Sequence, residues 1–115
     1  MRRGEIVTVS LDPARGSEAS KTRPAVIVSN DAANATASRL GRGVITLVPL
    51  TSNTARVYPF QALLPASLTG LPHDSKAQAE QVRSVAVERV GARIGHLPAA
   101  LIADVDQALR VHLNL

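Results

Sequence analysis

Pro24 opens a short apolar segment and fixes the backbone at the point where a buried strand begins. The pyrrolidine ring sets φ at Pro24 and pushes the preceding Arg23 into extended geometry. The run from Pro24 to Ser29 is short and strongly apolar, which is typical of a buried strand. Arg23 is therefore expected at the mouth of that strand, where its guanidinium is held still beside a charged loop that ends at Lys21.

Three further runs are predicted to be strands, because β-forming residues in each are bounded by turn signals. These runs are Glu5–Leu11, Gly43–Thr51 and Phe60–Leu64. Pro49 lies near the end of the second of them and lacks the N–H that a sheet ladder needs, so it predicts an edge position or a bulge there. The chain therefore has the pattern of a small, mainly β domain.

Two helices are predicted, one after the Pro24 strand and one near the C-terminus. Ala32–Ser38 is rich in alanine and follows Asn30, a residue type that can cap a helix N-terminus. Pro98 opens the second helix, whose apolar and polar residues lie on opposite faces. The apolar face comprises Leu101, Ile102, Val105, Ala108, Leu109 and His112 or Leu113. We interpret this face as a packing surface and not as a reactive site.

The segment from Ser75 to Val90 fits two structures. Lys76–Arg83 consists of residues with high helix propensity. Yet its residues also alternate between two sets, Ala77 and Ala79 in one and Gln78 and Glu80 in the other, in a way that a strand can use. The residues alone leave helix and strand open.

Composition narrows the possible partners. A chain of 115 residues is expected to form one domain, residues 1–115, small enough that oligomerisation would help its stability. Its formal net charge of +4 is compatible with an anionic partner without requiring one. Tyr58 and Phe60 are the only aromatic residues, so a bound nucleic acid would be held by phosphate contacts and polar groups rather than by stacking. The chain contains no cysteine, which predicts a cytoplasmic protein. It also contains no apolar run near the roughly 20 residues that span a bilayer, so no membrane partner is expected.

The three histidines do not predict a metal site. His73, His96 and His112 lie far apart in the sequence and have no metal-binding spacing. His73 falls in the predicted turn Thr69–Asp74 and reads as part of a hairpin tip, while His96 reads as a surface residue of the predicted turn Ile94–Pro98. No glycine-rich phosphate loop follows a strand. We therefore expect neither a metal nor another cofactor.

Three polar residues in strand contexts are candidates for chemistry. Arg23 is the first. Thr51 offers a hydroxyl where a strand opens into a polar loop, although plain turn chemistry also explains a threonine there. Glu80 lies in a polar cluster flanked by small residues. The alternative to a chemical role for Glu80 is an ion pair with Arg83 or a position on a solvated face.

Three ordered blocks of the chain resemble the MazF/PemK (Kid) family, the toxin endoribonucleases of toxin–antitoxin pairs. The first block joins Arg2–Pro13 to Lys21–Asn30, similar to the family's RGEIW, LDP and RPxxIVS elements. Leu47–Asn53 is similar to its strand ending in P(V/L)TS. Asp74–Val85 is similar to its DSxxxxEQ(I/V)R(T/S)I block. The resemblance runs from Arg2 to the C-terminal helix.

The resemblance implies a fold, an activity and partners. The fold would be an SH3-like small β-barrel with short helices and a C-terminal amphipathic helix, and it favours a strand in Ser75–Val90. The activity would be sequence-specific, metal-independent cleavage of single-stranded RNA by a homodimer, inhibited by a cognate MazE-like antitoxin. Two other functions stay open: a CcdB-like gyrase inhibitor that acts by binding protein, and a non-catalytic barrel that binds nucleic acid.

The resemblance also implies roles for individual residues. The family's catalytic arginine and threonine match Arg23 and Thr51, and some members use an acidic residue as base at the position of Glu80. Residues in or beside the same blocks are expected to contact RNA: Ser17, Lys21, Ser52, Asn53, Gln78 and Gln81. The chain departs from some members at three of its positions. It has Ser17 in place of a loop histidine, Gln78 in place of a strand arginine and Val7 in place of an aromatic residue.

Overall fold

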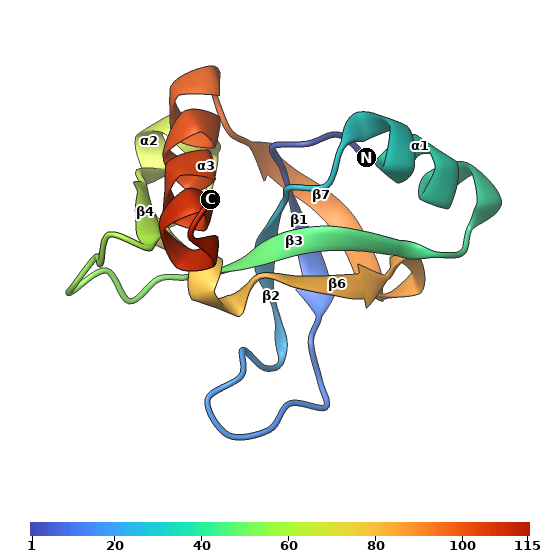
Figure 1. Ribbon diagram of the computed structural model, residues 1–115, viewed down its shortest axis with the longest axis horizontal. Coiled ribbons are helices and arrows are strands. Elements are labelled where there is room, and N and C mark those ends of the chain that lie inside the picture. Colours follow the sequence, from blue (N-terminus) through green and yellow to red (C-terminus); the bar gives the residue numbers. More distant parts are fainter.

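The computed structural model, which describes residues 1–115, contains one antiparallel sheet that curls into an open barrel (Figure 1). Its strands are β1 (Glu5–Ser10), β2 (Thr22–Ile27), β3 (Val44–Thr51), β4 (Gln61–Leu64), β5 (Ser75–Gln78), β6 (Arg83–Ala86) and β7 (Val90–His96). The strand order is β4-β5-β3-β2-β1-β7, and β6 pairs with β3 outside this path. The terminal strands β4 and β7 do not pair with each other, so the sheet is not closed. The expected small, mainly β, barrel-like fold is confirmed, with an open rather than a closed sheet.

Strand β3 forms the centre of this sheet because it has neighbours along both edges. One edge pairs with β2, and the other pairs first with β6, over Val44–Leu47, and then with β5, over Leu50 and Thr51. Pro49 falls between those two partners on the second edge, while it is matched with Ala25 of β2 on the first. Strand β3 is therefore not an edge strand, and of the two alternatives expected at Pro49, an edge position or a bulge, the edge position is wrong. The proline is accommodated where one neighbouring strand has ended and the next has not begun.

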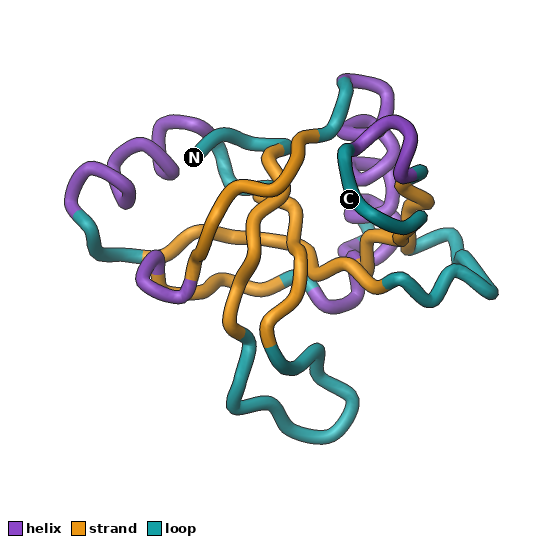
Figure 2. Tube along the Cα trace, turned by 180° about the vertical axis from the view of Figure 1, so that it is seen from behind, coloured by secondary structure: helices purple, strands orange, loops and turns teal.

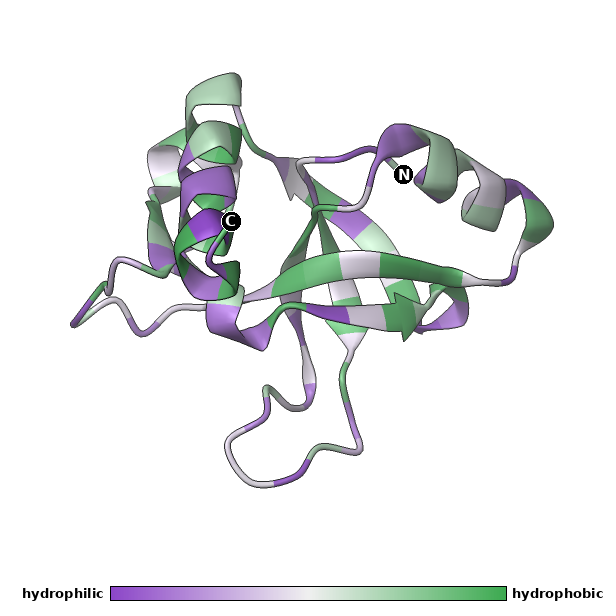
Figure 3. Ribbon diagram, viewed as in Figure 1, coloured by the Kyte–Doolittle hydropathy of each residue, from purple (hydrophilic) through white to green (hydrophobic).

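The hydrophobic core has two clusters, one on each face of the central strands. Because successive side chains of a strand point to opposite faces, Val48 and Leu50 of β3 belong to the first cluster and Ile45 and Leu47 to the second. Figure 3 shows how apolar residues dominate along β3. The first cluster is covered by the C-terminal helix, and the second includes Ala37 of the helix that precedes β3.

Three helices accompany the sheet: α1 (Asp31–Leu40), α2 (Ala66–Thr69) and α3 (Ala99–Leu113). Asn30 caps α1, as predicted, by accepting a hydrogen bond from the Ala33 N–H at 2.8 Å. On α3 the predicted apolar face is buried at Leu101, Val105 and Ala108, whereas the side chains of the last turn are exposed. None of these helices has both the length and the apolar character needed to cross a membrane.

The segment from residue 75 to residue 96 is extended, so the helix alternative is wrong. Strands β5, β6 and β7 follow one another with short 3₁₀ turns between them, Ala79–Gln81 and Val87–Arg89. Glu80 therefore lies in a 3₁₀ turn and not in a strand.

Strand β7 was not predicted, and the expected surface turn around His96 is wrong. His96 is the last residue of β7 and is matched with Glu5 of β1. Glycines weaken the strand pattern in the sequence, but here they mark close approaches of the backbone. A Cβ at Gly95 would lie 2.5 Å from the carbonyl oxygen of Thr69, and one at Gly91 would lie 2.3 Å from the Thr8 hydroxyl oxygen.

Candidate active site

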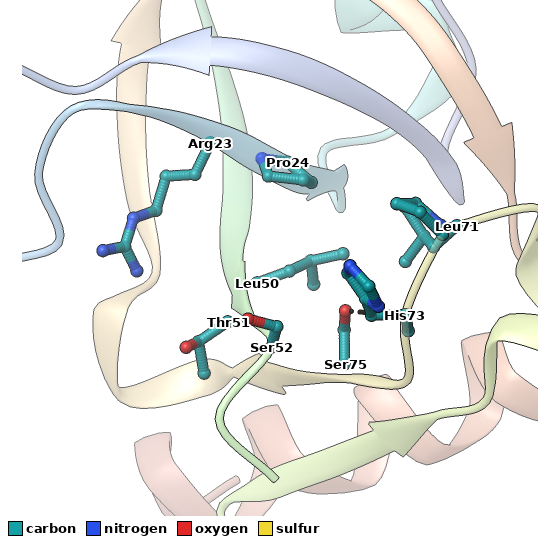
Figure 4. A pocket seen from close by; sticks show the side chains of 9 residues that line it. Arg23, Pro24, Leu50, Thr51, Ser52, Leu71, His73 and Ser75 are labelled. Carbon is teal, nitrogen blue, oxygen red and sulfur yellow. Dashed lines mark hydrogen bonds between the residues drawn. The ribbon is translucent and has the colours of Figure 1, made fainter.

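A cleft of about 290 Å³ lies where the beginning of β2, the end of β3 and the segment that leads into β5 meet (Figure 4). The three segments are far apart in the sequence and are brought together by the pairing of β3 with β2 on one edge and with β5 on the other. The residues that line the cleft are Arg23, Pro24, Leu50, Thr51, Ser52, Leu71, Pro72, His73 and Ser75. The cleft therefore combines an apolar floor with one cation, several hydroxyls and an imidazole.

Arg23 lies near the start of β2, at the mouth of the strand where the sequence places it. Its side chain is half-buried, and its Nε donates a hydrogen bond to the Ser20 carbonyl oxygen at 2.9 Å. That contact fixes the plane of the guanidinium. Neither Nη group has a hydrogen-bond partner or an acidic neighbour within salt-bridge distance. The side chain thus presents donors in a fixed geometry, an arrangement suited to phosphate oxygens.

Thr51 ends β3 at the edge of the cleft. Its hydroxyl oxygen accepts a hydrogen bond from the Asn53 N–H at 3.3 Å, and the Asn53 side chain accepts one from the Ala55 N–H at 3.3 Å. These are the side chain–backbone turns that threonine and asparagine commonly make. Because the Thr51 hydroxyl acts as an acceptor in that turn, its hydrogen is left to donate to a ligand in the cleft.

Glu80, the third residue expected at the site, does not line the cleft. Its Oε2 accepts a hydrogen bond of 2.7 Å from the side chain of Gln61, and its Oε1 is buried without a hydrogen-bond partner. The alternative ion pair with Arg83 is not formed. Gln78, two residues earlier, likewise has a buried side-chain oxygen without a partner and does not line the cleft.

Gln81 holds the long β1–β2 loop in place. Its side-chain oxygen accepts a hydrogen bond from the Ala19 N–H at 3.0 Å, and its amide donates to the Ser17 carbonyl oxygen at 2.9 Å. A second set of contacts closes the base of the loop, where the Asp12 carboxylate accepts from the Lys21 N–H at 2.8 Å. Figure 2 shows this loop projecting away from the sheet. Gln81 thus uses both ends of its side-chain amide to hold the main chain of the loop.

The structure brings together some of the residues expected to contact RNA and separates others. Ser52 lines the cleft with Arg23 and Thr51, and Asn53 follows it as an exposed residue. Ser17 and Lys21 are exposed on the β1–β2 loop.

His73 lines the cleft, although the sequence analysis interpreted it as part of a hairpin tip. It precedes β5, in the connection from α2, and Figure 4 shows its imidazole ring pointing into the cleft. Hydrogen bonds fix the backbone around it. The Asp74 carboxylate accepts from the Ala66 N–H at 2.8 Å, and the Ser75 hydroxyl donates to the His73 carbonyl oxygen at 3.3 Å. The sequence of the turn around His73 does not by itself predict that this connection folds over the end of β3.

The two aromatic residues gather with two cations beside the site. The rings of Tyr58 and Phe60 stack with their centroids 5.2 Å apart and their planes 4° apart. The Arg56 guanidinium carbon lies 5.6 Å from the Tyr58 ring centroid, and the Lys76 ammonium nitrogen lies 5.9 Å from it. Lys76 also donates a 2.6 Å hydrogen bond to the Arg56 carbonyl oxygen, which ties the β3–β4 loop to β5.

The chain contains no group of three or more His, Asp or Glu residues placed to hold a metal ion.

Comparisons with known proteins agree over the length of the chain. Residues 2–113 match the family of the PemK-like, MazF-like toxin of type II toxin–antitoxin systems. The chain is 67% identical over 115 residues to the endoribonuclease MazF9 of Mycobacterium tuberculosis, covering 100% of this chain and 98% of that protein. The crystal structure of MazF (Form-I) from Deinococcus radiodurans matches with a TM-score of 0.80 and 27% identity, covering 100% of this chain and 97% of the other. The MazE–MazF (Form-II) crystal structure from the same organism matches with a TM-score of 0.74 and 26% identity, covering 100% and 96%.

Proposed function

The chain belongs to the family of PemK-like, MazF-like toxins of type II toxin–antitoxin systems, and we propose that its cleft cleaves single-stranded RNA. The protein is an endoribonuclease, as is its 67% identical relative by name. The observation that carries the proposal is the arrangement of Arg23 and Thr51 in one cleft. Arg23 has free, oriented donors, and Thr51 has a hydroxyl able to donate. A toxin with this activity acts in the cytoplasm, where cleavage of messenger RNA would stop translation and growth.

Few protein groups are needed for this reaction, because RNA supplies its own nucleophile. When the 2′ oxygen attacks phosphorus, negative charge builds on the non-bridging oxygens, and a positioned guanidinium stabilises that charge best. We assign Arg23 to this charge and to the leaving 5′ oxygen, and Thr51 to orientation of the phosphate. We further assign contacts with the nucleotides on either side to Ser52 and Asn53 on one loop and to Ser17 and Lys21 on the other.

The products should carry a 2′,3′-cyclic phosphate and a 5′-hydroxyl, because a 2′-oxygen nucleophile leaves the phosphate on the upstream fragment. We expect this result when a long single-stranded RNA is incubated with the purified protein and the fragment ends are mapped chemically. Cleavage should proceed in excess EDTA, since the proposed reaction uses no metal. Strict dependence on magnesium would contradict the metal-free mechanism. Intact RNA together with growth arrest in cells would instead support a protein-binding, CcdB-like toxin.

We further propose that a cognate antitoxin with an acidic, extended segment binds across the cleft. The basic residues in or beside the two loops that flank it favour an acidic partner: Arg15, Lys21, Arg23 and Arg56. A MazF structure with 26% identity to this chain was solved together with MazE. The active form is proposed to be a homodimer, to which the C-terminal part of α3 contributes. There Val111 and Leu113 are 44% and 50% exposed.

The cognate antitoxin should therefore inhibit RNA cleavage competitively. Opposite charges steer association, so binding should be fast and should slow as salt is raised. Cleavage rates measured over a grid of RNA and antitoxin concentrations test the competition, and sedimentation at micromolar concentration tests the dimer. Tight antitoxin binding that leaves RNA cleavage unchanged would contradict the shared cleft. A monomer in sedimentation would contradict the dimer.

A further inference from the structure

We infer that His73 is a catalytic residue, the general base that takes the proton from the attacking 2′-hydroxyl. The inference rests on the proposed ribonuclease function. It concerns the removal of the 2′-hydroxyl proton, a step to which that proposal assigns no residue of the cleft. Its basis is the place of the imidazole, which points into the same cleft as Arg23 and Thr51 (Figure 4).

The composition of the cleft singles out His73. Apart from His73, the lining residues are apolar, carry hydroxyls or, in the case of Arg23, carry a permanent positive charge. Hydroxyl groups and a guanidinium hold their protons at neutral pH, whereas an imidazole exchanges its proton between about pH 5 and 8. His73 is therefore the one lining residue able to accept a proton under ordinary conditions. Glu80, the acceptor expected from the resemblance, is engaged by Gln61 outside the lining of the cleft.

The positions of Arg23 and His73 suit an in-line displacement. Arg23 enters the cleft from β2 and His73 from the connection that precedes β5, so a phosphate held near Thr51 would have one of them toward each side (Figure 4). In an in-line displacement the nucleophile and the leaving group lie on opposite sides of the phosphorus atom, so the reaction is helped by one protein group on each side. With Arg23 at the 5′ oxygen, His73 faces the 2′ oxygen.

The step balances with no co-reactant other than water. The neutral imidazole takes the 2′-hydroxyl proton while the 2′ oxygen forms its bond to phosphorus. The bond between phosphorus and the 5′ oxygen breaks, its electron pair leaves with that oxygen, and the oxygen takes a proton from water. The products are the cyclic phosphate and the 5′-hydroxyl, and the imidazolium later loses its proton to solvent.

A base must be neutral to accept a proton, so the pH dependence of cleavage reports on the base. Arg23 is the one lining residue with a permanent charge. Asp74 is the next residue in the chain, and its carboxylate is engaged by the Ala66 N–H. Because the reaction needs a neutral imidazole, wild-type cleavage should be faster at pH 8 than at pH 5.

The test compares His73→Gln with a matched variant, His96→Gln, in single-turnover cleavage of one RNA from pH 5 to pH 8. His96 is exposed at the end of β7 and does not line the cleft. Loss of the base should lower the His73→Gln rate by about 10²-fold or more and remove the rise with pH. The affinity for an uncleavable RNA with a 2′-deoxy group at the scissile nucleotide should stay within about threefold. His96→Gln should match the wild type in rate and in pH dependence.

Chemical rescue separates a catalytic role from a structural one. In His73→Ala, added imidazole should restore part of the rate, and the rescue should grow with the concentration of its neutral form. Three outcomes would overturn the inference: His73→Gln cleaving at the wild-type rate, the rise with pH persisting in that variant, or no rescue by imidazole with the fold intact by circular dichroism. In each of these the wild type still cleaves RNA, and the proposed function stands. A wild-type protein that does not cleave RNA would overturn both.

Discussion

Replacing the scissile nucleotide of an RNA substrate with its 2′-deoxy counterpart should abolish cleavage at that bond. The 2′-hydroxyl is the nucleophile of the proposed reaction, and no residue in the cleft replaces it. The lining residues include hydroxyls at Thr51, Ser52 and Ser75, but none of them has a base within hydrogen-bond distance that could activate it. The measurement is fragment yield from matched oligonucleotides that differ by this one oxygen atom.

The control is the same deoxy substitution placed two nucleotides downstream of the scissile bond. That substrate keeps the nucleophile, so it should be cut at close to the rate of the all-RNA substrate. The scissile-deoxy oligonucleotide should still compete for binding, because it keeps every phosphate that could bind to Arg23. Cleavage of the scissile-deoxy substrate at a rate comparable with RNA would contradict attack by the 2′ oxygen.

Arg23→Ala should lower single-turnover cleavage by about 10²–10³-fold, the usual cost of removing one positioned donor from developing oxyanion charge. Since that charge is greatest in the transition state, turnover should fall more than RNA affinity. The cleavage rate of Arg23→Lys should lie between the rates of the wild type and Arg23→Ala. Lysine keeps the positive charge but lacks the Nε–H that donates to the Ser20 carbonyl oxygen. The measurements are the single-turnover rate at saturating protein and the dissociation constant for the scissile-deoxy RNA.

Arg39→Ala is the matched control for Arg23→Ala, because Arg39 is exposed in the last turn of α1 and does not line the cleft. It removes the same charge from the molecule and should leave the rate of cleavage within about twofold. Circular dichroism and thermal unfolding show whether Arg23→Ala keeps the fold after loss of one hydrogen bond, a change of about 0.5–1.5 kcal/mol in the free energy of unfolding. Near-normal turnover by folded Arg23→Ala would remove the residue from the mechanism.

Local rules explain the parts of the fold that could be predicted. Pro24 fixes its own backbone and that of its neighbour, so the start of β2 follows from two residues. Asn30 caps α1 through a bond that reaches only three residues along the chain. Helix α3 follows from a periodic pattern confined to one segment. Each of these signals is decided by residues close in the sequence.

Contacts across the sheet explain the parts that could not be predicted. Gly91 and Gly95 weaken a strand when read alone, but β7 needs them where β1 and the end of α2 approach its backbone. Pro49 suggests an edge until one knows that two different strands share that edge of β3. The same holds for the cleft, where Arg23 and Thr51 were found through their strand contexts, while the place of His73 depends on how the α2–β5 connection folds back.

The way Gln81 holds the β1–β2 loop bears on how such a protein can change the RNA sequence that it cuts. Both of its hydrogen bonds to the loop end on main-chain atoms, the Ala19 N–H and the Ser17 carbonyl oxygen. Main-chain atoms are the same for almost every amino acid, so the exposed loop positions can exchange side chains without releasing this anchor. Natural variation, or a combinatorial library at positions 15 and 17, can therefore change exposed side chains of the loop while Gln81 still holds its main chain.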